Sequence, residues 1–258
     1  MPSAADIIVG TAGWAIAAAH RDAFGGGDSV LERYAGKLGG VEVNSSFYRR
    51  HRLSTWARWA QSVPTDFKFA VKMPKDISHT HKLHDCEAAT QAFLDDIQGL
   101  GHKLGCLLLQ LPPSFVFDEV IAQRYFAFLH AQTPIDIVCE PRHPSWFDAK
   151  ADAFLNSMAI ARAAADPAIV PGAASPGGWR GLSYFRLHGS PHMYRSAYAG
   201  PRLSDYARNL KADADDGRRV WCMFDNTASS AATSDALALS DMLMPMPIRM
   251  DPDRAGAA

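Results

Sequence analysis

Charged side chains gather at the ends of several apolar, strand-like stretches of the sequence. Glu42, Lys72 and Glu140 each lie at or near the end of such a stretch, and Arg186 and His188 alternate with apolar residues in another. Two carboxylates in different electrostatic surroundings can take different pKa values, so that one serves as a general base and the other as a general acid. We therefore predict acid–base chemistry on a small anionic or sugar-like substrate. The predicted catalytic residues are Glu42, Glu140, His188 and Lys72.

Eight apolar or β-branched stretches predict the strands that position these residues. Segments of helical composition separate them, and several of these segments open on Asp, Ser or Thr, which are preferred at the N-cap position of helices. The alternation of strand and helix predicts a parallel sheet with helical crossovers, and eight repeats in 258 residues is the size of a closed barrel. The predicted strands are 7–10, 40–44, 67–72, 106–111, 136–140, 161–166, 182–189 and 220–226.

The predicted fold class is therefore α/β, a single (β/α)8 TIM barrel. The connection after the sixth strand reads PAIVPGAASPGGWRG, and its Pro and Gly residues predict that the helix there is missing or irregular. A doubly wound open sheet is the competing architecture, but no G-x-G-x-x-G motif follows the first strand. We expect residues 1–244 to form the barrel domain and residues 245–258 to form a loosely ordered tail.

The alternation of side chains along a strand predicts where the polar residues point. Phe69 and Val71 suit the layer of helices, which turns Lys72 toward the inside of the barrel, and the same period of two turns Glu140 and Arg186 inward. Barrel enzymes keep their active sites at the C-terminal ends of the strands. Structural ion pairs are the alternative interpretation, but burying several charges in one place costs stability, which favours a functional site.

The composition limits the partners and the location of the protein. The formal net charge is −1, from 26 basic and 27 acidic residues, so the overall positive field of a dedicated nucleic-acid binder is absent. The four cysteines form no C-x-x-C pair, and we expect buried free thiols. The first residues carry no signal-peptide pattern, and no apolar run has the length of a membrane span. We expect a cytoplasmic protein that does not insert into membranes.

Seven ordered motifs resemble the YecE-like family, also known as domain of unknown function 72. They are GTAGW, VEVNSSFYR, FKFAVKMPKDISH, LLLQLPPSF, EPRHPSW, YFRLHG and MFDN, and together they extend over nearly the whole chain. The resemblance implies a TIM barrel and supplies no reaction. From the motif residues we take as substrate-binding candidates Trp14, Asn44, Tyr48, His79, Gln110, Arg142, His143, Trp146, Arg186 and Asn226.

The sequence departs from the family pattern after the last strand. That pattern usually has two asparagines followed by a glycine and a further asparagine. Here Asp225 stands at the first asparagine position, and Ser229 and Asp235 lie near the later ones. A ligand contact made by this loop in other members is therefore not carried over to this chain.

A metal-dependent phosphoesterase or endonuclease-like hydrolase is an alternative function. A divalent metal would suit a mixed set of carboxylates and imidazoles, whereas no motif for an organic cofactor is present. Neither an H-x-H nor an H-E-x-x-H spacing occurs, and Lys72 and Arg186 would compete with the metal for the carboxylates. The candidate ligands are Glu42, His79, Glu140, Asp166 and His188.

A non-catalytic binding protein is the second alternative. The stretch SSFYRRHR interleaves Phe47 and Tyr48 with Arg49, Arg50 and Arg52, a composition that can stack bases and pair with phosphates. We prefer to interpret it as a solvated basic loop, so nucleic acid is not the favoured partner. The favoured partner is a small molecule that carries an anionic or phosphate group, with a further anion site in the loops after the seventh and eighth strands.

Overall fold

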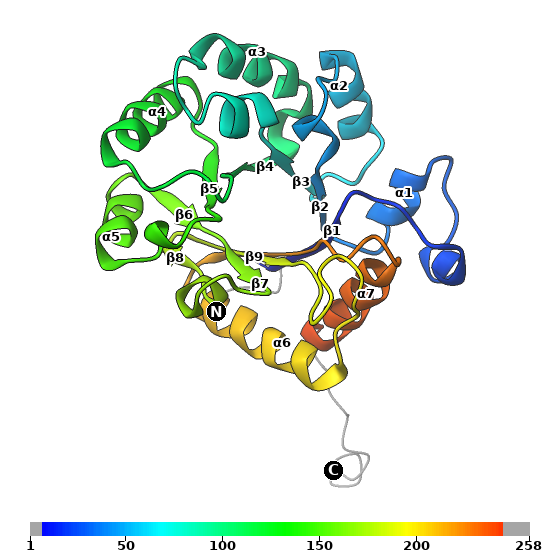
Figure 1. Cartoon of the computed structure of the whole chain (residues 1–258). Coiled ribbons are helices and arrows are strands. Elements are labelled where there is room, and N and C mark those ends of the chain that lie inside the picture. The colour runs from blue at the N-terminus through cyan, green and yellow to red at the C-terminus, as the bar shows by residue number, and fades with distance from the viewer. Residues whose placement is uncertain (1–6, 245–258) are drawn as a thin grey trace, which may run out of the picture.

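Strands and helices alternate along the chain, and the helices form a ring around an inner barrel of strands (Figure 1). The computed structural model describes residues 7–244. The strands are β1 (Ile7–Ala12), β2 (Gly40–Val43), β3 (Lys68–Lys72), β4 (Leu104–Gln110), β5 (Asp136–Glu140), β6 (Ile160–Arg162), β7 (Ala164–Asp166), β8 (Gly177–Gly178), β9 (Leu182–Leu187) and β10 (Arg219–Phe224). The α-helices are α1 (Val30–Ala35), α2 (Leu53–Gln61), α3 (Glu87–Ile97), α4 (Glu119–Gln132), α5 (Ala149–Ser157), α6 (Gly200–Asp215) and α7 (Ala231–Leu243).

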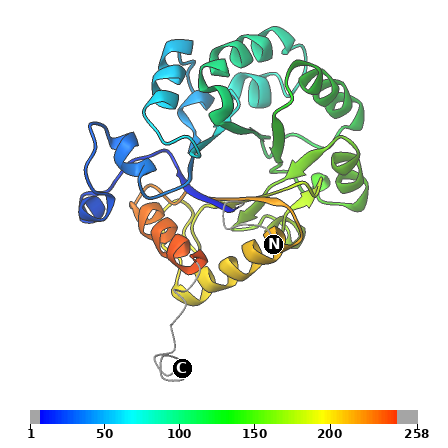
Figure 2. The ribbon, with the colours of Figure 1, turned by 180° about the vertical axis from the view of Figure 1, so that it is seen from behind.

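Short helical segments occupy several of the connections. They are the 3₁₀ segments η2 (Ala18–Phe24), η3 (Ser45–Phe47), η5 (Gln98–Lys103), η6 (Pro144–Trp146) and η7 (Pro171–Ala174), and the π segment η4 (Asp76–Thr80). Seen from the opposite end of the barrel, the helices again surround the strands (Figure 2).

One interrupted strand closes the barrel. The strand order is β7-β9-β10-β1-β2-β3-β4-β5-β6-β8. Only Ala163 separates β6 from β7, and β6 pairs with β5 whereas β7 pairs with β9, so residues 160–166 join the two sides of the sheet. With β6 and β7 counted together, residues 7–244 contain eight parallel strands, and β8 adds a short antiparallel ladder to β6. The predicted α/β TIM barrel is confirmed.

The connection between β7 and β9 differs from the others, as the sequence predicts. In the described chain it contains η7 and β8 and no α-helix. Three of the described α-helices begin at capping residues: Ser29 forms a capping box with Glu32 at α1, and Asp118 and Asp148 accept backbone N–H groups at α4 and α5.

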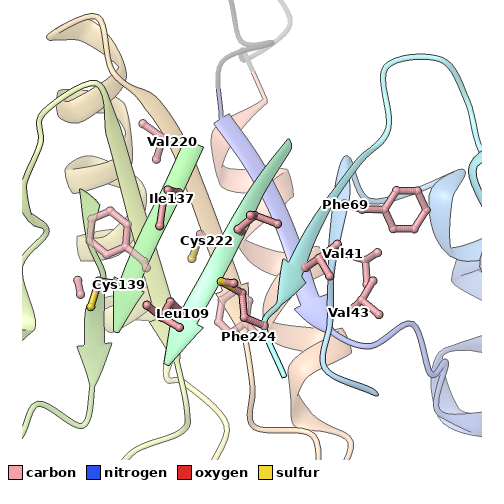
Figure 3. Packing of buried hydrophobic residues seen from close by; sticks show 14 of the residues in the cluster. Val41, Val43, Phe69, Leu109, Ile137, Cys139, Val220, Cys222 and Phe224 are labelled. Atoms are coloured by element: carbon pink, nitrogen blue, oxygen red, sulfur yellow. The ribbon is translucent and has the colours of Figure 1, made fainter. Parts of the chain in front are cut away.

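Buried apolar side chains form two layers, one on each face of the strands. The larger layer fills the space between strands and helices, and Figure 3 shows part of it, with side chains from β2, β3, β4, β5 and β10. The smaller layer fills the inside of the barrel. It consists of Ala70, Cys106, Leu108, Val138, Ala161, Ala163, Leu182, Tyr184, Trp221 and Met223. All four cysteines are buried and free, as expected.

Two sequence predictions concern the ends of the chain and the membrane. The expected tail, residues 245–258, lies outside the described residues. Within residues 7–244, every helix is too short or too polar to cross a lipid bilayer.

Candidate functional site

Arg186 is the centre of a buried cluster of charges at the C-terminal mouth of the barrel. It lies near the end of β9 and is fully buried, because the strand period turns it inward above Tyr184. Its Nε donates to Glu42 Oε2 (2.9 Å) and its Nη2 to Glu42 Oε1 (2.6 Å), which gives a bidentate pair. Its Nη1 donates to Glu140 Oε2 (2.7 Å), and its Nη2 also donates to Asp225 Oδ2 (2.9 Å). One guanidinium thus holds three carboxylates.

Glu42 is held by Tyr184 as well as by Arg186. The Tyr184 hydroxyl donates to Glu42 Oε2 (2.8 Å), and burial raises the pKa of this tyrosine well above its ordinary value, which keeps the phenol a donor. Both oxygens of Glu42 are therefore occupied, and its side chain has no exposed surface. The Glu42 carboxylate, which lies within β2, accepts three hydrogen bonds there.

Glu140 stays ionised at neutral pH. Burial alone would raise its pKa, but the guanidiniums of Arg186 and Arg142 hold the pKa well below its ordinary value. Arg142 Nη2 lies 2.6 Å from Glu140 Oε1. A carboxyl group with such a low pKa is a poor general acid at pH 7.

His188 connects two carboxylates and one arginine. Its Nδ1 lies 3.1 Å from Asp225 Oδ2, and its Nε2 lies 3.1 Å from Glu140 Oε1 and 2.8 Å from Arg142 Nη2. A neutral ring with its proton on Nδ1 accepts from Arg142, whereas an imidazolium donates to Glu140, so the proton on Nε2 decides which contact is the hydrogen bond. We call these residues the ion network: Glu42, Glu140, Arg142, Arg186, His188 and Asp225.

Lys72 stands apart from the ion network. It ends β3, is 7% exposed, and places its Nζ 4.3 Å from the centre of the Phe47 ring. Burial, followed by the charge of Arg186, lowers its pKa from 10.5 to about 8, although Glu42 and other carboxylates act in the opposite direction. No side chain or carbonyl within residues 7–244 accepts a hydrogen bond from its ammonium. A lysine with this pKa is neutral in about a tenth of the molecules at pH 7.

Two asparagines beside the ion network carry unpaired oxygens. Within the described residues, the buried Oδ1 atoms of Asn44 and Asn226 have no hydrogen-bond partner. Asn226 Nδ2 donates to Asp235 Oδ2 (2.7 Å) and to the Ser196 carbonyl (2.9 Å). The departures from the family pattern therefore have structural roles here, because Asp235 holds Asn226 and Asp225 joins the ion network.

Phe47, which lies beneath the Lys72 ammonium, also lines a cavity of about 610 Å³. Tyr48, which is 79% exposed, lines it together with Arg49 and Lys75. His79 packs its ring edge-on against Phe47, with 5.0 Å between the ring centres. Burial, followed by the charge of Lys72, lowers the pKa of His79.

A second cavity, of about 390 Å³, lies near the start of α7, and four of its lining residues carry hydroxyl groups: Thr11, Thr227, Ser230 and Thr233.

Other candidate residues lie apart from the ion network. Trp146 is fully buried, and its Nε1 donates to the Phe115 carbonyl (2.9 Å). Trp14 packs edge-on against Trp59, with 4.9 Å between the ring centres. His143 caps η6 by accepting the Ser145 N–H (3.2 Å). These three side chains contribute packing or capping.

Gln110 ends β4 in register with Glu140, and no side-chain hydrogen bond of Gln110 is present in the described part of the protein.

Asp166 does not point into the barrel, which corrects its proposed place among metal ligands. Its Oδ1 lies 2.6 Å from Arg202 Nη2 and its Oδ2 accepts from the Tyr206 hydroxyl (2.9 Å), both on α6. Within residues 7–244, no three His, Cys, Asp or Glu side chains are arranged to hold a metal ion. The carboxylates at the mouth are bound to Arg186 instead.

The basic stretch after β2 is only partly available to a ligand. Arg50 Nε donates to Asp96 Oδ2 (2.7 Å), and Phe47 is buried beneath Lys72. Tyr48, Arg49 and Arg52 are exposed.

Tyr184 and Asp225 are the two site residues that the candidate list lacks. Tyr184 lies two residues before Arg186, so the strand period already placed it on the same face. Asp225 follows β10 directly, but no local sequence pattern indicates that it reaches Arg186 and His188.

The closed ring of parallel strands, with polar side chains at their C-terminal ends, places this protein in the (β/α)8-barrel class. The chain belongs to the family described as "Protein of unknown function DUF72", whose model matches residues 8–255. The UPF0759 protein YecE of Escherichia coli (strain K12) is 31% identical over 121 residues, which are 47% of this chain and 44% of that protein. The same values hold for YecE of Escherichia coli O157:H7. The match thus spans less than half the length of these curated relatives.

Solved structures of the same family share the fold. A DUF72 family protein from Enterococcus faecalis V583 superposes with a TM-score of 0.77 at 20% identity, covering 92% of this chain and 95% of that chain. A DUF72 family protein from Thermotoga maritima MSB8 gives a TM-score of 0.75 at 22% identity, covering 92% and 98%. The predicted resemblance to the YecE-like family is confirmed.

Proposed function

We propose that this protein is an enzyme that carries out acid–base chemistry on a small anionic or sugar-like substrate, with Lys72 as the proton-transferring group. The observation that carries the proposal is a buried lysine at the barrel mouth whose pKa is lowered to about 8. A general base is most effective when its pKa lies near the working pH. A lysine held in a structural ion pair would instead have a raised pKa.

The ion network provides the electrostatic surroundings for this lysine. Its hydrogen bonds occupy both oxygens of Glu42 and of Glu140, so we assign these two residues to positioning and charge balance instead of proton transfer. Arg186 is fixed by three carboxylates and lowers the pKa of Lys72 by its charge. His188 is the second proton carrier, because its Nε2 faces both an acceptor and a donor.

The surroundings of Lys72 suit an anionic substrate with hydroxyl groups. The ammonium lacks an acceptor among the described residues, and the buried Nε of Arg142 lacks one as well. The unpaired oxygens of Asn44 and Asn226 can accept from substrate hydroxyls. The cavity of about 610 Å³ that Phe47 lines has the size of a small-molecule site.

The test is a turnover screen with a matched lysine control. Native protein, Lys72→Met and Lys37→Met, a change at an exposed lysine between α1 and β2, are incubated with defined pools of sugar phosphates, sugar acids and hydroxy acids, and consumption is followed by mass spectrometry. We expect one class of compound to be consumed by the native protein and by Lys37→Met but not by Lys72→Met. Consumption that persists in Lys72→Met would refute the assignment, and a compound that binds at Lys72 without being consumed would show a binding protein instead.

A further inference from the structure

A further cavity lies on the flank of the barrel, where the helix after the sixth strand is missing. Its volume is about 360 Å³, and we call it the flank cavity. The segment that contains β8 forms one wall, the first half of β9 forms the floor, and the C-terminal half of α6 forms the other wall. Figure 1 shows this region between α5 and α6, where short loops replace a helix. Ser183 faces it from the outer side of β9, whereas Arg186 faces the mouth.

Three arginines line the flank cavity, and two of them are held in ion pairs. Arg162 is buried and donates to Asp152 Oδ1 (3.3 Å) and to the Gly172 carbonyl (3.0 Å). Arg218 is paired with Asp213 (2.9 Å) and with Asp216 (3.1 Å). Arg180 is exposed and has no ion pair or side-chain hydrogen bond with any described residue. Among the described residues, Arg180 is therefore the arginine of this cavity that is free to pair with a ligand.

The Ser183 hydroxyl supplies the second observation. Ser183 is 1% exposed, and its Oγ has no hydrogen-bond partner within residues 7–244. Leaving a buried hydroxyl unpaired is costly, so a group that pairs with it from the cavity is favoured. The neighbouring outward side chains on the same strands, Phe185 and Val220, are apolar and offer no partner.

We propose that the flank cavity binds a small oxyanion, a phosphate or carboxylate group, between Arg180, Arg218 and the Ser183 hydroxyl. The volume is at the lower end of the range for small-molecule sites, which suits a compact and highly polar ligand. The guanidinium of Arg180 pairs with the anion at the edge, and the Ser183 O–H donates to it at the floor. This site is independent of the function proposed for the mouth.

The test is calorimetric titration of the full chain with inorganic phosphate, sulfate and citrate at constant ionic strength set with chloride. We expect Arg180→Gln to weaken binding roughly tenfold or more, because it removes a charged hydrogen-bond donor. Ser183→Ala should weaken binding several-fold, with no loss of melting temperature in the absence of the anion. Arg208→Gln, at an exposed arginine of α6 that does not line the flank cavity, should leave the affinity unchanged. The ratio of phosphate to citrate affinity identifies the preferred oxyanion.

Three results would overturn the proposal. Binding no tighter than that of chloride would mean that water fills the flank cavity. An affinity unchanged in Arg180→Gln but lost in Lys72→Met would place the anion at the mouth. A Ser183→Ala protein with a higher melting temperature and an unchanged phosphate affinity would show that the hydroxyl has no part in anion binding.

Discussion

Replacing Lys72 with methionine should stabilise the protein at neutral pH. The pKa falls from 10.5 to about 8 on folding, and 1.36 kcal/mol per pKa unit gives a cost of about 3 kcal/mol for keeping the ammonium charged in the native state. Methionine keeps the length and apolar character of the side chain. It loses the cation–π contact with Phe47, worth about 1 kcal/mol, so we expect a net gain of about 2 kcal/mol.

The stability gained by Lys72→Met should depend on pH. Below pH 8 the lysine is protonated in both the folded and the unfolded protein, and the full cost is present. Between pH 8 and 10.5 only the unfolded protein keeps the proton, so the native protein becomes more stable as the pH rises and the advantage of Lys72→Met disappears.

Urea denaturation at pH 7 and pH 10 measures both free energies of unfolding. Lys75→Met is the control, because Lys75 is exposed in the same loop region and its replacement should change stability by less than about 0.5 kcal/mol. A Lys72→Met protein that is less stable than the native protein at pH 7, or a difference that is the same at both pH values, would refute the reasoning.

Three further predictions concern the ion network. Arg186→Met should lower the free energy of unfolding by about 3–5 kcal/mol, because it leaves buried carboxylates without their partner. Arg186→Lys should not restore the bidentate pair. A decrease below 1 kcal/mol for Arg186→Met in urea denaturation would contradict this prediction. Tyr184→Phe should lower the free energy of unfolding by about 1.5–3 kcal/mol, because it removes a hydrogen-bond donor to the Glu42 carboxylate. An unchanged midpoint of urea denaturation would contradict a stabilising role of that hydrogen bond. The free energy of unfolding of the native protein should fall as the pH drops from about 4.5 through the lowered pKa of Glu140. The free energy of unfolding of Glu140→Gln should depend less on pH between pH 5 and 2. Parallel pH dependences of the two proteins would contradict this prediction.

The sequence predicts the barrel and the inner faces of its strands because both depend on local periodicity. Charged residues end β3 and β5 and lie near the end of β9, and the period of two along each strand predicts that Lys72, Glu140 and Arg186 point inward. The Pro- and Gly-rich connection after the sixth strand likewise predicts the absence of a helix there.

The pairing of side chains depends on contacts that are distant in the sequence. Arg186 lies 144 residues from Glu42, and no local pattern shows that one guanidinium also reaches Glu140 and Asp225. The sequence does not show which face of the strand Asp166 takes, because the residues around it are mostly alanine and give no contrast between the two faces. It does not show the burial of Trp146 either, because that burial depends on Phe115, which lies 31 residues earlier.

The central claim is that the barrel mouth holds a lysine poised for proton transfer, and a direct measurement of the Lys72 pKa tests it. Protein labelled with ¹³C and ¹⁵N in its lysines is titrated from pH 6 to 11, and the Lys72 signal is assigned from the spectrum of Lys72→Met. We predict a midpoint of about 8. A midpoint above 10, in the ordinary range of exposed lysines, would contradict the claim.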